Sequence, residues 1–125
     1  MEALSVGMYV RHKTLLSSKY VKINKIKEIE EKENCLHIWL EDKDLITEKY
    51  LIKASYNIIN ILEEGDYVNG QEVYYDEELD FLYVQSFDAD GEFYQENIAK
   101  QSFIDNIKSV ITHEQMEQMA YKVEE

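Results

Sequence analysis

The chain has 125 residues, of which 45 % are hydrophobic, and its 26 acidic and 13 basic side chains give a formal net charge of −13. This apolar share is well above that of disordered acidic tails, so the composition predicts one globular domain with its own core. The single cysteine, Cys35, excludes an internal disulfide and favours a reducing compartment. No apolar run approaches the roughly 20 residues of a membrane span, and the first residues lack signal-peptide character. We therefore expect a soluble cytoplasmic protein with no membrane contact.

The charge is divided unevenly along the chain. Residues 1–57 contain ten Lys or Arg against nine Asp or Glu, a net charge of +1, whereas residues 58–125 contain three Lys against 17 Asp or Glu, a net charge of −14. Because like charges on a compact body repel one another, such a surplus indicates a positively charged partner or a role in solubility. Arg11 is the only arginine, and arginine is the residue preferred for two-point phosphate contacts, so direct binding of nucleic acid is not expected.

The first 57 residues predict a meander of short strands. Val6–Arg11 alternates Val6, Met8 and Val10 with residues of a second face that includes Arg11, the period of a half-buried strand. A second strand is expected over Tyr20–Ile29, with an apolar phase that slips to Ile26 and Ile29 as a bulge or a strand end would allow. The remaining expected elements are a turn over Glu30–Asn34, a strand over Cys35–Leu40, a turn over Glu41–Asp44 and a strand over Leu45–Ala54.

The rest of the chain predicts hairpins followed by a short helix. Ser55–Leu62 is compatible with a short helix capped by Ser55 or with a 3₁₀ turn. Asn69-Gly70 is a strong hairpin signal between alternating residues. Further strands are expected over Leu79–Phe87, Glu92–Ala99, Ile107–Ile111 and Ala120–Val123, with a turn at Asp88–Gly91. Thr112 and Gln115 form a capping-box pattern that opens a helix with Met116 and Met119 facing inward.

These elements predict a mainly β (α+β) fold in one domain, residues 1–125. Its two parts would be a β meander over residues 1–57 and acidic hairpins with a short C-terminal helix over residues 58–125. Since each sheet has an apolar face that must be buried against another element, the front meander should pack against the later hairpins.

Carboxylates and aromatic residues alternate in the middle of the second part. Carboxylates on neighbouring strands and turns can present a fixed negative array comparable to a phosphate backbone, and tyrosine offers rigid contact area with a polar tip. The alternative is a solvated acidic surface with the aromatic residues in the core. The residues we assign to partner binding are Tyr74, Tyr75, Asp76, Glu77, Glu78, Asp80, Asp88, Asp90, Glu92 and Tyr94.

Other chemistry finds little support in the residue pattern. Asp88–Gly91 resembles the middle of a calcium loop, but its two anchoring ligands are missing. His113-Glu114 starts like a zinc-protease helix without the second histidine, and Cys35 with His37 lacks further metal ligands or a third catalytic group. We therefore predict no catalytic residues, no metal and no cofactor. The basic stretch Lys19–Lys27, which includes Tyr20, could contact phosphates, although the acidic second part would repel nucleic acid.

Three segments together resemble a group of small phage and prophage proteins of Firmicutes. They are Val6–Arg11, then Ile52–Ile59 with Gly65–Gly70, and finally Ile107–Gln115 leading to Tyr121–Val123. The resemblance implies a phage or mobile-element setting, an SH3-like β portion at the front and no catalytic residues. In size, charge and setting the chain also resembles acidic anti-CRISPR inhibitors, many of which imitate nucleic acid.

From these observations we predict a phage-encoded, non-enzymatic inhibitor of a bacterial defence system in the host cytoplasm. It would be an anti-CRISPR protein that binds the basic nucleic-acid groove of a Cas effector by acidic mimicry. One alternative is a phage protein-interaction module with a solubilising acidic surface. Another is a protein that sequesters a nucleotide signal through the lysines of the front part.

Overall fold

The computed structural model describes residues 3–14 and 21–119. Strands make up 48 % of the structure and helices 15 %, in three antiparallel sheets and two short α-helices, so the predicted mainly β class is confirmed. No helix in the described ranges is long and apolar enough to cross a bilayer.

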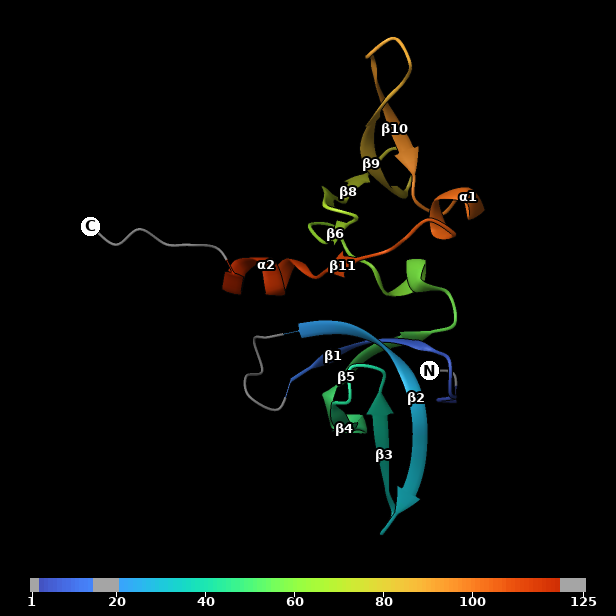
Figure 1. Cartoon of the computed structure of the whole chain (residues 1–125), viewed down its shortest axis with the longest axis vertical. Coiled ribbons are helices and arrows are strands. Elements are labelled where there is room, and N and C mark those ends of the chain that lie inside the picture. The colour runs from blue at the N-terminus through green and yellow to red at the C-terminus, as the bar shows by residue number, and fades with distance from the viewer. Residues whose placement is uncertain (1–2, 15–20, 120–125) are drawn as a thin grey trace, which may run out of the picture.

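A five-stranded antiparallel sheet forms the front part of the molecule (Figure 1). Its strands lie in the order β4-β3-β2-β1-β5, and their bounds are β1 Tyr9–Lys13, β2 Val21–Lys32, β3 Cys35–Leu40, β4 Leu45–Thr47 and β5 Leu51–Ser55. Six buried apolar side chains form its core cluster: Met8, Val10, Ile26, Ile38, Leu40 and Ile46. Burial of these side chains from strands that alternate apolar and polar residues is what stabilises the sheet.

The predicted meander is largely confirmed. β3 has the predicted bounds. Of the two readings of the slipped apolar phase, a bulge and a strand end, the bulge is confirmed, because the β2–β3 register shifts between Ile26 and Glu28 while β2 continues. The expected turn at Glu30–Asn34 shrinks to Glu33-Asn34, because β2 continues to Lys32. The single strand expected over Leu45–Ala54 is wrong, since a 3₁₀ turn, η1 (Glu48–Tyr50), separates β4 from β5.

Two three-stranded sheets form the second part. One has the order β11-β6-β7, with β6 Tyr67–Val68, β7 Gln71–Glu72 and β11 Val110–Ile111. The other has the order β10-β9-β8, with β8 Tyr74–Asp76, β9 Phe81–Phe87 and β10 Phe93–Asn97. The helical elements are η2 Ile58–Ile61, α1 Gln101–Ile104 and α2 His113–Met119. A second apolar cluster joins these elements through Leu62, Val68, Val73, Val84 and Ile98.

The local signals of the second part have mixed outcomes. Asn69 and Gly70 both have positive φ, 51° and 80°, in the two-residue turn between β6 and β7, so the Asn-Gly hairpin is confirmed. Within Ser55–Leu62 the 3₁₀ turn η2 forms, and its cap is Asn57 and not Ser55, because Asn57 Oδ1 accepts from the Ile59 N–H.

Of the predictions for the C-terminal segment, some are confirmed and others are not. The capping box is confirmed, because Thr112 Oγ1 accepts from the Gln115 N–H and Gln115 Oε1 accepts from the Thr112 N–H. Only Val110–Ile111 of the core strand expected over Ile107–Ile111 is extended, and the one-turn helix α1 was not expected. The strand expected over Ala120–Val123 lies outside the described residues, as do Lys19 and Tyr20 and the side chain of Met119.

Candidate functional site

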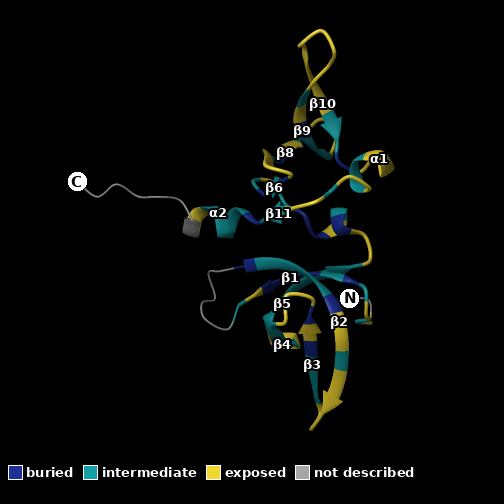
Figure 2. Cartoon of the chain, in the orientation of Figure 1, coloured by how far each residue is buried: buried dark blue, intermediate teal, exposed yellow. Residues whose placement is uncertain are grey.

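The sheet β8-β9-β10 and its two turns, residues 74–97, form what we call the acidic arm. In Figure 1 its β9–β10 hairpin projects from one end of the molecule, while the β2–β3 hairpin lies at the other end. Figure 2 shows that the outer half of this hairpin is exposed, whereas the strand segments nearer the body are buried or half-buried. All ten residues predicted to bind a partner belong to the arm.

The strand register places most aromatic rings of the arm on one face. Phe81, Tyr83 and Phe87 occupy alternate positions of β9, and their side chains therefore point the same way. Across the sheet Tyr83 pairs with Tyr74 of β8, and the two rings stack with centroids 5.7 Å apart. The opposite face of β9 carries Val84, which is fully buried in the second apolar cluster. Tyr74 thus packs within an aromatic row and is only partly available to a partner.

The tip of the arm carries an exposed aromatic pair that the sequence reading did not assign to the site. Phe87 and Phe93 face each other across β9 and β10, with ring centroids 4.4 Å apart and exposed fractions of 62 % and 66 %. Tyr94, a predicted contact residue, is also exposed, and it points to the other face because it follows Phe93. The sequence did hold a signal for this pair, because Phe87 and Phe93 stand on either side of a five-residue turn and can therefore face each other across a hairpin.

The carboxylates at the tip differ in what their side chains do. Asp88 Oδ1 accepts from the N–H groups of Asp90 and Glu92, which holds the turn together. The Asp90 and Glu92 side chains are exposed and make no ion pair or hydrogen bond within the described part of the chain. Two of the three predicted tip carboxylates are therefore available to a partner, and the third is structural.

The same division holds at the turn between β8 and β9. Asp76 Oδ1 accepts from the N–H groups of Glu78 and Leu79, and Asp80 accepts a short hydrogen bond from the Tyr75 hydroxyl, which raises the pKa of Tyr75. The exposed side chains of Glu77 and Glu78 have no cationic partner among residues 3–14 and 21–119.

The structure does not join the predicted carboxylates into one continuous array. The turn with Glu77 and Glu78 precedes β9 and the turn with Asp90 and Glu92 follows it, so the full length of β9 lies between the two groups, about 20 Å for a strand of this length. The Debye length at physiological ionic strength is about 8 Å. The two groups therefore act as separate charge clusters.

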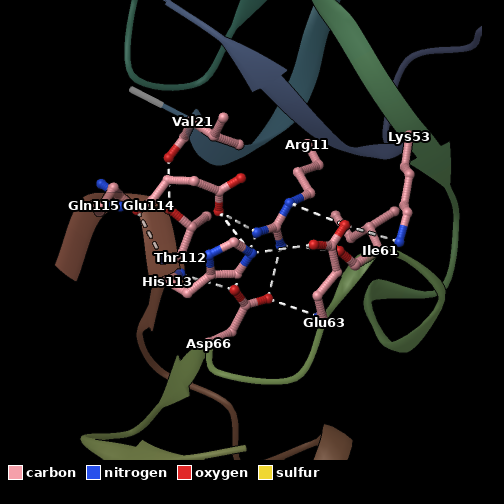
Figure 3. Close-up of polar contacts among 10 residues, drawn as sticks. All are labelled: Arg11, Val21, Lys53, Ile61, Glu63, Asp66, Thr112, His113, Glu114 and Gln115. Atoms are coloured by element: carbon pink, nitrogen blue, oxygen red, sulfur yellow. Dashed lines mark hydrogen bonds and ion pairs between the residues drawn. The ribbon is translucent and has the colours of Figure 1, made fainter. Parts of the chain in front are cut away.

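A second cluster of charged residues lies between the front sheet and the second part, around Arg11 (Figure 3). Arg11 lies on the second face of β1, the face that a half-buried strand would leave to solvent, yet its exposed fraction is 0 %, so the expectation of a half-buried strand is wrong at this position. Its Nη1 donates to Asp66 Oδ2 at 2.7 Å and its Nη2 to Asp66 Oδ1 at 3.1 Å. Nη2 also donates to Glu114 Oε1 at 2.5 Å, and Nε lies 3.4 Å from Glu63 Oε2. The guanidinium is thus surrounded by three carboxylates.

Asp66, also fully buried, links the same cluster to two backbone segments. Besides Arg11, its carboxylate accepts from the N–H of Glu63 at 2.7 Å and from the N–H of His113 at 2.9 Å. The Thr112 hydroxyl donates to the Val21 carbonyl at 2.6 Å and so ties the start of α2 to β2. These contacts join β1, the turn before β6 and the first residue of α2 at one point.

The ion pairs of this cluster shift the titration of its members. Burial alone would lower the pKa of Arg11, but the Asp66 hydrogen bond and the three surrounding carboxylates outweigh it and raise that pKa. Burial likewise tends to raise the pKa of Glu63, yet hydrogen bonds from Lys53 and His113 and the Arg11 charge bring the net pKa below its usual value. Both shifts favour the charged forms.

Glu63, His113 and Glu114 have ligand atoms within 4.8 Å of one another, a spacing compatible with a metal ion. The same oxygens already serve cations of the protein, since Glu63 Oε2 lies 2.9 Å from Lys53 Nζ and Glu114 Oε1 lies 2.5 Å from Arg11 Nη2. A divalent ion would have to displace both contacts and face two positive charges. We therefore assign this cluster to the architecture of the fold.

The chain was compared with protein-family models, with curated proteins and with solved structures, and none of the three comparisons gives a match.

Proposed function

We propose that this chain is a phage-encoded, non-enzymatic inhibitor whose acidic arm docks in a basic nucleic-acid groove of a bacterial protein. The candidate partner is a Cas effector, and the place of action is the cytoplasm of the host. The tip of the arm, residues 87–94, would enter the groove, and the carboxylates at the β8–β9 turn would make a second contact.

The observation that carries this proposal is the exposed Phe87–Phe93 pair beside unpaired carboxylates. Exposed apolar surface costs about 25 cal/mol per Å² relative to burial, so contiguous aromatic surface at the end of a projecting hairpin favours an interface. Aromatic anchors are enriched at the centre of protein interfaces. The pair therefore supports docking by the tip rather than by the whole acidic surface.

The charge around that pair supports a cationic groove as the partner surface. Asp90 and Glu92 flank the rings, and no cation of the described chain neutralises them. Lysines and arginines that normally hold phosphate could pair with these carboxylates, while the rings fill apolar contacts between them. Binding there would exclude the nucleic acid by direct competition.

The experiment that tests the proposal measures binding and target cleavage with purified Cas effector–guide complexes from Firmicutes. We expect the wild-type chain to bind and to inhibit cleavage, and we expect binding to weaken as NaCl rises from 50 to 500 mM. The variant Asp90→Lys/Glu92→Lys should lose at least tenfold in affinity, and so should Phe87→Ser/Phe93→Ser. Asp88 is left intact in both variants because it holds the turn.

The matched control is Glu30→Lys/Glu31→Lys on β2, at the opposite end of the molecule (Figure 1). Both glutamates are exposed, and the substitution changes the net charge by the same +4. We expect this control to bind within twofold of wild type. Equal loss in both charge variants would mean that net charge alone drives binding, and undiminished binding of the tip variants would exclude the tip as the contact.

The alternative of a phage interaction module with a solubilising acidic surface gives a different result in the same experiment. In that case none of the Cas effectors would bind, and a phage structural or replication protein would be retained on the wild-type chain but not on Phe87→Ser/Phe93→Ser.

A further inference from the structure

A cavity of about 650 Å³ lies between the front sheet and the segment that runs from α1 to β11. This volume is within the roughly 300–1,000 Å³ of small-molecule sites. It is separate from the acidic arm and from the Arg11 cluster, since it contains no residue of either. Its aliphatic lining comes from five residues: Ile23, Ile58, Ile104, Ile107 and Val110.

The walls of this cavity carry two lysines in a molecule of net charge −13. Lys25 comes from β2, and Lys108 comes from the loop before β11, so they approach the cavity from its two sides. Neither makes an ion pair with any described carboxylate. Lys108 is also one of only three cations in residues 58–125. Glu41 is the single carboxylate in the lining, so the cavity is locally cationic.

Two tyrosines supply flat surfaces in the same cavity. Tyr9 pairs with Lys25 across β1 and β2, and the Lys25 ammonium lies 5.5 Å from the centre of the Tyr9 ring. Tyr56 is 58 % exposed although it lines the cavity, so its ring is accessible to a ligand. A planar heterocycle can stack on such a ring, as nucleobases do on aromatic side chains in single-stranded complexes.

Three side-chain amides complete the polar part of the lining: Asn24, Asn57 and Gln101. The Nδ2 group of Asn24 already donates to His12 Nε2 and Asp42 Oδ2, whereas the other two amides have free groups. Asn57 Oδ1 accepts from the Ile59 N–H, which leaves the Nδ2 group of Asn57 as a donor. Gln101 Nε2 donates to Asp105, which leaves Gln101 Oε1 as an acceptor. A donor and an acceptor at the wall match the edge of a nucleobase, which presents both.

We infer that this cavity binds a nucleotide, with the base stacked on Tyr56 and the phosphates held by Lys25 and Lys108. Lysine binds phosphate as a point charge, so one or two phosphate groups satisfy the two ammonium groups. A long nucleic acid would meet the −14 charge of the second part, and the assignment is therefore to a small nucleotide. This inference does not depend on the function proposed for the arm.

The test is calorimetric titration of the full chain with AMP, ATP and a cyclic dinucleotide. Inorganic pyrophosphate tests the contribution of the phosphate groups alone, and adenosine tests that of the base and sugar alone. We expect at least one nucleotide to bind with a Kd below 1 mM, and at least tenfold more tightly than pyrophosphate or adenosine. Lys25→Ser/Lys108→Ser should weaken that binding at least tenfold, and Tyr56→Ser at least threefold.

The matched control is Lys27→Ser/Lys100→Ser, which removes the same charge from exposed positions near the cavity that do not line it. We expect its affinity to stay within twofold of wild type, and circular dichroism confirms that each variant is folded. Three results would overturn the inference: no binding of any nucleotide at 1 mM, equal losses in both double variants, or tighter binding of a ten-nucleotide single strand than of every small nucleotide. The arm variants Asp90→Lys/Glu92→Lys should bind the nucleotide normally.

Discussion

Arg11 and Asp66 stand 55 positions apart in the chain and form a two-point ion pair with no exposed surface. Burying two charges is costly unless their geometry is good and their remaining hydrogen-bonding groups are satisfied. Asp66 meets this condition through two backbone N–H groups. Arg11 meets it at Nη1 and Nη2 through the Ile61 carbonyl and Glu114, whereas its Nε makes no hydrogen bond and has only the ion-pair contact with Glu63 at 3.4 Å. The pair therefore specifies how the front sheet meets the second part.

We predict that Arg11→Lys destabilises the protein by about 2–4 kcal/mol, because an ammonium cannot make the planar two-point contact and leaves carboxylates without a partner. Asp66→Ala should cost about 3–5 kcal/mol for the same reason. Urea unfolding followed by circular dichroism measures both values. The control Lys27→Ala, at an exposed position, should stay within about 0.5 kcal/mol of wild type. A loss below 1 kcal/mol in both cluster variants would show that the cluster is not stabilising.

His12, next to Arg11, gives the protein a dependence on pH. Its ring is buried, with Nδ1 bonded to the Lys13 carbonyl and Nε2 to the Asn24 amide, and burial lowers its pKa from the ordinary 6.5. The neutral form is therefore favoured in the folded state. The stability that this provides is complete above pH 6.5 and is lost as the pH falls toward the folded pKa, because the unfolded chain takes up the proton first.

We predict that the free energy of unfolding falls between pH 6.5 and pH 5, with a contribution from His12 of at most about 1.4 kcal/mol per pH unit. His12→Gln should reduce this slope. The decrease in its free energy of unfolding at pH 7.5, where His12 is neutral in both states, reports only the changed packing. Urea unfolding at pH 7.5, 6.5 and 5.5 separates the two effects. An unchanged slope in His12→Gln would assign the pH dependence to other groups.

At the scale of elements, local signals predicted the structure where neighbouring residues decide it. Asn69-Gly70 forms its turn because both positions have positive φ, and Thr112 with Gln115 caps α2 through reciprocal hydrogen bonds. Strand β3 follows from strict alternation over six residues. Each of these features needs only residues within a few positions of one another, and a single sequence displays them.

Elements that depend on distant contacts were not predictable in the same way. Alternation predicted a half-buried strand around Arg11, because it cannot show that the second part of the chain covers the face that carries this residue. A signal did exist, since a chain with 12 lysines retains one arginine, the residue suited to buried two-point pairs. The ten predicted contact residues were all placed in the arm, but the separation of the two acidic turns depends on the strand pairing that sets the length of β9.

The three segments that carry the phage-family resemblance meet at the same place in the fold. Arg11 ends the first segment, Asp66 belongs to the second, and Thr112 and Glu114 belong to the third. These contacts show that the three segments lie together in this fold, and the phage-family resemblance stays a prediction. It carries no information about the arm, whose residues lie between the second and third segments.

At the scale of the whole molecule, a net charge of −13 on 125 residues opposes compaction. We predict that the melting temperature rises as NaCl increases from 10 to 300 mM, because the Debye length falls from about 30 Å to below 8 Å and screens this repulsion. The combined variant Glu30→Lys/Glu31→Lys/Asp90→Lys/Glu92→Lys adds eight charges, which changes −13 to −5, and should show a smaller rise. Thermal melts at four salt concentrations measure both slopes. A melting temperature that falls with salt would show that attractive ion pairs outweigh the repulsion.

The Arg11 guanidinium also limits how the chain can be divided into fragments that fold. A fragment that stops before Ile58 would keep the positive group while losing every carboxylate that balances it, and the complementary fragment would keep Asp66 with nothing to oppose it. Neither fragment would therefore keep the balanced ion pairs that the full-length fold contains. We therefore expect that residues 1–57 cannot be moved into another protein as an independent domain. A split-protein design should likewise keep Arg11 and its three carboxylates in the same fragment.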